Sequence, residues 1–120
     1  MSDVVVTVPK GRWQEWIAEG DLPGDPWTGY ANHFWIRARP LPVIGVGERV
    51  YIVAHGKLRG WAPLDSTELR CRLRPQSACL IRKGGAFAVT IDRPIVGFRG
   101  WRYRDWERDE ERPFPDWRTP

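Results

Sequence analysis

The sequence predicts a single α+β domain that is mainly β: a small β-barrel of six or seven strands, with one N-terminal helix and an irregular C-terminal tail. Two observations predict this class. Short runs of β-branched and aromatic residues recur between glycines and prolines, which is typical of small barrels rather than of parallel sheets. Helical spacing of apolar residues is found near the N-terminus. We expect the barrel domain at residues 1–106 and, at residues 107–120, a charged, proline-containing tail that packs on the barrel or extends from it.

The first thirty residues predict a strand, a helix and a loop. Residues 4–8 are β-branched up to the proline that follows, which favours a buried strand. Residues 11–20 predict a helix, because Trp13, Trp16 and the isoleucine after it fall at i, i+3 and i+4. Residues 21–30 contain two prolines and two glycines and predict a loop. A loop of this length in a compact domain is often functional.

The rest of the barrel is predicted from shorter runs. Apolar or alternating segments bounded by glycine or proline predict strands at residues 33–39, 49–54, 57–63, 78–82 and 86–91. Residues 68–74 could form an exposed strand or a ragged edge, and residues 94–106 form the last ordered segment. In the tail, Phe114 and Trp117 could anchor the chain to the body.

A tight hairpin joins two of these strands. His55-Gly56 predicts a two-residue turn. With this turn, Ile52 is expected to face Arg59 across the ladder. The side chains then expected on the outer face are Lys57, Arg59 and Trp61.

Charge is distributed unevenly along the chain. The net charge is +4, from nineteen Lys or Arg and fifteen Asp or Glu. Residues 105–120 hold six acidic and three basic side chains, so the preceding 104 residues hold sixteen basic and nine acidic ones, a net +7. A basic body suits a polyanionic partner, although surface charge also confers solubility.

Eight tryptophans share the chain with these cations, often as sequence neighbours. An aromatic ring stacks on a base while a nearby guanidinium contacts phosphate, so the pattern favours nucleic-acid binding. The competing interpretation is that the indoles fill the core. The candidate ligand-binding residues are Trp27, Thr28, Asn32, Arg37, Lys57, Arg59, Trp61, Arg99, Trp101, Arg102 and Tyr103.

Other classes of site have weaker signals. Cys71 and Cys79 fit neither a zinc site nor a secreted disulfide framework, and either a disulfide across a turn or two thiols is consistent with their spacing. The two histidines, His33 and His55, lack further ligands at metal-site spacing, and no nucleophile elbow accompanies them. We expect no catalytic residue, metal or cofactor. Without a signal peptide or a long apolar run, we expect a cytoplasmic protein with no membrane partner.

Two short motifs carry a resemblance to a known superfamily. Gly47-Glu48-Arg49-Val50 opens one predicted strand, and Gly60-Trp61-Ala62 lies in the next. With the strand, helix and tryptophan loop before them, they resemble the PUA-like superfamily, which includes the PUA, ASCH, EVE and YTH domains, over roughly residues 3–104. The resemblance implies a pocket for a single base, modified or not, walled by Trp27 and a second aromatic residue. Trp61 and Trp101 are both candidates for that second wall.

One departure bears on the activity. ASCH domains typically follow the helix with Gly-x-Lys, whereas this chain has Gly20-Asp21-Leu22, and the missing lysine weighs against an ASCH-type hydrolase. We therefore expect a module that binds single-stranded or flipped-out bases of RNA or DNA. The alternatives are a small ASCH-like hydrolase or ribonuclease acting on nucleosides or RNA, and a protein-interaction domain. The sequence leaves the oligomeric state open.

Overall fold

A computed structural model describes residues 2–18, 33–37, 40–69, 77–82 and 86–120. Along the chain the elements are β1 (Val4–Thr7), η1 (Lys10–Arg12), α1 (Trp13–Ala18), β2 (His33–Arg37), β3 (Arg49–Ala54), β4 (Lys57–Glu68), β5 (Ser77–Arg82), β6 (Val89–Thr90), β7 (Trp101–Tyr103), η3 (Arg108–Glu110) and β8 (Arg112–Pro113). The mainly-β class with one short N-terminal helix is confirmed.

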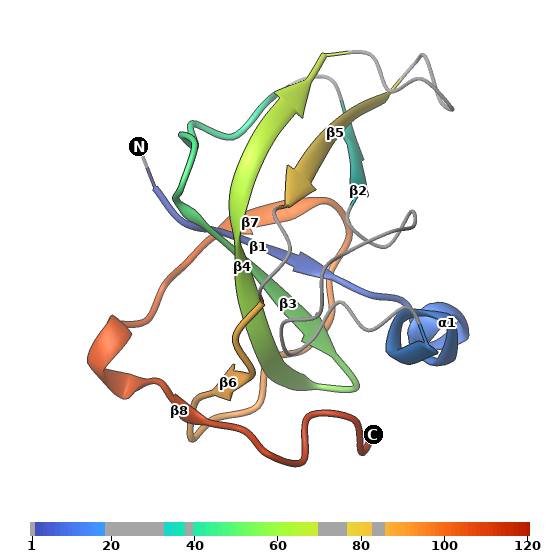
Figure 1. The fold of residues 1–120 in the computed structure, drawn as a ribbon, viewed down its shortest axis with the longest axis vertical. Helices are drawn as coiled ribbons and strands as arrows, with labels where there is room; N and C mark the ends of the chain where they lie inside the picture. The colour runs from blue at the N-terminus through green and yellow to red at the C-terminus, as the bar shows by residue number, and fades with distance from the viewer. Residues whose placement is uncertain (1, 19–32, 38–39, 70–76, 83–85) are drawn as a thin grey trace.

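Six strands form one sheet in the order β2-β5-β4-β3-β1-β7, and β6 pairs with β8 in a separate two-stranded sheet. The large sheet curls into a half-barrel, and the long, bent β4 belongs to both of its halves (Figure 1). β1 and β3 are parallel, whereas the other pairs in this sheet are antiparallel. The register of β4 shifts against each of its neighbours, and such irregularities bend a strand.

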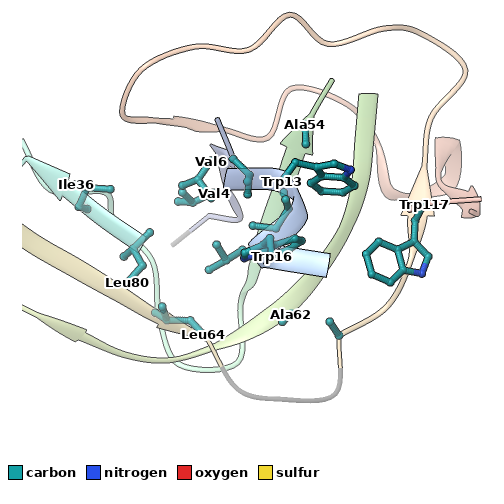
Figure 2. Packing of buried hydrophobic residues seen from close by; sticks show 14 of the residues in the cluster. Val4, Val6, Trp13, Trp16, Ile36, Ala54, Ala62, Leu64, Leu80 and Trp117 are labelled. Atoms are coloured by element: carbon teal, nitrogen blue, oxygen red, sulfur yellow. The ribbon is translucent and has the colours of Figure 1, made fainter. Parts of the chain in front are cut away.

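The inner face of the curl holds the larger hydrophobic cluster, to which β1 to β5 all contribute. Figure 2 shows Val4 and Val6 of β1 pointing into the same space as Trp13 and Trp16 of the helical segment. Trp117 of the tail closes this cluster. The helix stripe and the tail anchor predicted from the sequence are therefore confirmed: Trp13, Trp16 and Trp117 are buried.

A second cluster covers the opposite face of β1, β3 and β4. Its buried members are Val5, Tyr51, Val53, Leu58, Ile91 and Trp106. They alternate along β1 and β3 with residues of the inner cluster, as the period of a strand requires. Because residues 89–106 cover this face, the central strands are buried on both sides and their sequences are continuously apolar.

The predicted hairpin is present, but its predicted register is wrong. His55 and Gly56 both have positive φ, at 49° and 72°, as the preferred two-residue turn requires. Ile52 pairs with Gly60 and Val53 with Leu58, so Arg59 is the extra residue of a bulge. Arg59 lies on the same face as Ile52, which is the inner face in the structure, and it is fully buried there against Trp13. The bulge brings Trp61 opposite Tyr51, so Trp61 packs on the second cluster and does not share a face with Arg59.

The segment after β5 also differs from the prediction. The sequence predicts a strand over residues 86–91, but regular pairing is limited to β6 and an isolated bridge between Trp61 and Phe87. Ala86 is buried, and Phe87 is 55% exposed. Among the described residues, no helix is long and apolar enough to cross a membrane.

Candidate functional site

The structure places only part of the predicted site. Trp27, Thr28 and Asn32 lie outside the described residues, as does Cys71. Arg37 is exposed at the end of β2 and pairs with Ser77 of β5. The pairing of β5 with β4 ends at Glu68 and Cys79, so Arg37 lies near the end of β4 that is far from the turn with β3. The remaining candidates come from the opposite end of β4 and from β7.

Several chain segments meet at the turn between β3 and β4. The backbone N–H of Val8 donates to the Val53 carbonyl at 2.9 Å, which continues β1 beside β3. The N–H of Ile95 donates to the Gly56 carbonyl at 2.8 Å, and the N–H of Phe98 donates to Thr7 Oγ1 at 3.2 Å. These bonds gather one set of residues, which we call the hairpin end: Lys10, His55, Lys57, Arg59 and Arg99.

Exposed cations of the described chain fall into two groups. Carboxylate partners lie within 4 Å of four exposed arginines: Arg12, Arg93, Arg108 and Arg112. No carboxylate of the described residues pairs with Lys10, Lys57, Arg99 or Arg102 at the hairpin end and β7, nor with the exposed Arg37 and Arg118 elsewhere. Their charge is therefore left to attract an anion from solution.

Arg59 does not lie on the exposed rim where the sequence analysis placed it. Its guanidinium is fully buried, donates from Nε to the Ala54 carbonyl at 2.9 Å, and donates from Nη1 to the carbonyls of Trp117 and Thr119. Burial lowers the pKa of the guanidinium below its ordinary value. Arg59 thus attaches the tail to the hairpin and is not available to a phosphate on the surface.

Trp61 does not offer a free ring face for a base. The guanidinium carbon of Arg49 lies 4.0 Å from the centroid of its ring, and Phe87 stacks on it at 4.7 Å with an interplanar angle of 26°. Arg49 belongs to β3 and Phe87 pairs from the other side of β4, so the two groups cover opposite faces of the indole. Trp61 is therefore a packed residue of the outer cluster.

The predicted site residues Trp101, Arg102 and Tyr103 lie on β7, where side chains alternate between the two faces of the strand. Trp101 packs against the inner cluster, donates from Nε1 to the Pro40 carbonyl at 3.2 Å and lies edge-on to Tyr103 at 4.9 Å. The Tyr103 hydroxyl accepts a bond from the Val43 N–H at 2.9 Å. On the other face, the guanidinium of Arg102 lies 4.2 Å from the Phe98 ring and is exposed.

A buried polar cluster that the sequence analysis missed attaches the tail to β3. Glu111 accepts bonds from the Tyr51 hydroxyl at 2.5 Å, from Trp106 Nε1 at 2.9 Å and from Arg49 Nη1 at 3.0 Å. Burial and the bond to Glu111 raise the pKa of Tyr51 far above its ordinary value. Every donor is satisfied by one carboxylate, so this arrangement holds the structure together rather than offering a catalytic group.

A second missed cluster joins the start of β1 to the chain after β7. Asp3 has a side chain that is 1% exposed and accepts bonds from the Arg49 backbone N–H at 2.9 Å, from Arg104 at 3.1 Å and from Arg108 at 2.9 Å. Burial raises the pKa of Asp3, but the bonds from Arg49, Arg108 and Arg104 outweigh it and hold the pKa below 3.8. Partners about one hundred residues apart leave no signal in a local sequence pattern.

Within the described residues, no group of three His, Cys, Asp or Glu side chains comes close enough together to hold a metal ion. Cys79 is buried in β5, where its Sγ lies 3.7 Å from Glu68 Oε2. Comparison of the chain with protein-family models, with curated proteins and with solved structures finds no match. The function is therefore inferred from the residues of the site.

Proposed function

We propose that the chain is a nucleic-acid-binding module of the PUA-like type, which contacts phosphates through the hairpin end and β7 and holds one base beside an exposed aromatic ring. One observation carries the proposal: Lys10, Lys57, Arg99 and Arg102 lack carboxylate partners within the described chain, although other exposed arginines have them. Unpaired cations on neighbouring segments suit a ligand with repeated negative charges.

The proposed base pocket has two aromatic walls, and the structure leaves fewer candidates for the second one. Trp61 is removed as a wall of the base pocket, because both faces of its ring are covered. Trp101 remains as the second wall, as a partly buried indole on the face of β7 opposite to Arg102. Trp27 is retained as the first wall on the strength of the sequence alone. The curled sheet with one N-terminal helix is compatible with the PUA-like type, and supports the proposal at that level only.

Binding to a labelled single-stranded 12-mer, as RNA and as DNA, tests the proposal by fluorescence anisotropy over a range of salt concentrations. The logarithm of the affinity should fall with the logarithm of salt by about 0.7 per phosphate contacted. Replacing Lys57, Arg99 and Arg102 together by glutamine should therefore reduce the slope by roughly 2.

The matched control replaces three paired arginines by glutamine, Arg12, Arg93 and Arg112, and so removes the same net charge. Their surface ion pairs contribute about 0–1 kcal/mol each, so the control protein should stay folded. Its salt slope should remain close to that of the wild type. Equal slopes for the two triple variants, or no binding of either strand at low salt, would refute the proposed function.

A further inference from the structure

Three side chains beside the turn between β3 and β4 have buried polar atoms without a hydrogen-bond partner in the described structure: Trp13 Nε1, His55 Nε2 and Arg59 Nη2. Trp13 contacts both of the others. The Trp13 and His55 rings lie 5.7 Å apart and edge-on, and the guanidinium carbon of Arg59 lies 5.2 Å from the Trp13 ring. Buried polar groups in folded proteins are nearly always paired, so three neighbouring exceptions indicate one shared partner.

The charge around these atoms favours a negative partner. The other donors of Arg59 meet only neutral carbonyl oxygens, and its second ring contact is Phe114 at 5.4 Å. The charged groups acting on His55 are both cations, Arg59 and Lys10. A buried guanidinium without a counter-charge is costly, whereas an anion that accepts its remaining N–H would offset that cost.

We propose that Trp13, His55 and Arg59 form an internal binding site for an oxyanion, namely a phosphate group, either free or carried by a small ligand. Trp13 Nε1 and Arg59 Nη2 are the donors, and His55 adds a third when it is protonated. Lys10 and the other exposed cations of the hairpin end favour a multiply charged oxyanion. The site differs from the proposed nucleic-acid surface and does not depend on it.

Access to the site is through the end of the tail. The carbonyls that cover Arg59 belong to Trp117 and Thr119, and the residues after Trp117 are exposed. Segments with few buried contacts open locally at a free energy well below that of global unfolding. Opening at residues 118–120 would expose the Arg59 guanidinium while Trp117 stays in the inner cluster.

Isothermal titration calorimetry tests this with two probes, inorganic phosphate and adenosine monophosphate, at constant ionic strength set with chloride. Saturable binding of either probe with a stoichiometry of one supports the site, and the probe that binds more tightly identifies whether the phosphate is free or part of a nucleotide. Absence of saturable binding for both probes at millimolar concentration would overturn it.

Trp13→Phe is the decisive variant, because it keeps a ring in the inner cluster and removes only an N–H that has no partner in the described structure. Phosphate binding should weaken about tenfold or more, as for loss of a hydrogen bond to a charged group. Arg59→Lys should weaken it further, but that change also removes bonds to the tail. Arg112→Gln is the control, because this exposed arginine is paired with Asp92 and lies outside both proposed sites, and its phosphate affinity should change by less than about threefold.

The outcomes separate this site from the proposed function. Phosphate binding that is lost in Trp13→Phe but kept in Arg112→Gln supports the internal site, whether or not the oligonucleotides bind. Equal phosphate affinity of Trp13→Phe and the wild type would refute it, even if the oligonucleotides bind with the expected salt slope.

Discussion

Removing the carboxylate of Glu111 should destabilise the protein more than any other single change in the tail. The side chain is 7% exposed and is the acceptor for three donors, on Tyr51, Trp106 and Arg49. Glu111→Ala leaves the Tyr51 hydroxyl and the indole N–H buried without a partner, at about 1–3 kcal/mol each. It also breaks a buried ion pair, so the free energy of unfolding should fall by about 3–5 kcal/mol.

Chemical denaturation in urea measures this change directly, with the slope against denaturant serving as a check that unfolding stays two-state. Asp109→Ala is the matched control, because it removes one exposed negative charge from the short helix just before Glu111 and should alter the free energy of unfolding by less than about 0.5 kcal/mol. If Glu111→Ala costs no more than Asp109→Ala, the tail is not held to β3 by this carboxylate.

Three further predictions concern pH and base binding. Asp3 has a lowered pKa, so its stabilising contribution is present above pH 3.8 and is lost as the pH falls further. Asp3→Asn should therefore lower the unfolding temperature at pH 7, and the difference in unfolding temperature between the variant and the wild type should shrink in acid. His55 also has a lowered pKa, because burial and then Arg59 and Lys10 disfavour its charged form. Stability should therefore decline as the pH falls below about 6.5, and a flat profile in His55→Asn, an exchange that tolerates the positive φ, would assign the decline to His55. Trp27→Ala should weaken oligonucleotide binding roughly 5-fold to 150-fold, as for one lost base stack, with a much smaller effect on the unfolding temperature; equal loss in both would make Trp27 a structural residue.

Local patterns predicted several elements of the fold, although not the segment at residues 86–91. The helix stripe, the β-branched first strand and the hairpin turn all depend on residues close in sequence, and each is present. The anchor at Trp117 was also anticipated, because a large apolar residue in a charged tail has few other roles. The parallel pairing of β1 with β3 was not predicted, since nothing in the sequence of either strand distinguishes a parallel neighbour from an antiparallel one.

Two features of β4 account for the errors at the site. The face that carries Ile52 and Arg59 is the inner one, so Arg59 is buried, although the turn itself was predicted correctly. The extra residue of the bulge reverses the side chains after it and places Trp61 on the opposite face. The covering of Trp61 by Phe87 depends on a bridge between segments 26 residues apart in the sequence. Aromatic and cationic neighbours in the sequence therefore identified the region of the unpaired cations, but not which side chains are exposed there.

An NMR titration with the single-stranded 12-mer tests the central claim most directly, because it reports the contacted backbone amides without any substitution. We expect chemical-shift changes at residues 55–57 and 99–102, decreasing as salt is raised, with little change at the paired arginines of residues 108–112. Shifts confined to residues 105–112, or no shifts at any amide with excess oligonucleotide, would contradict the assignment of the hairpin end and β7 as a nucleic-acid surface.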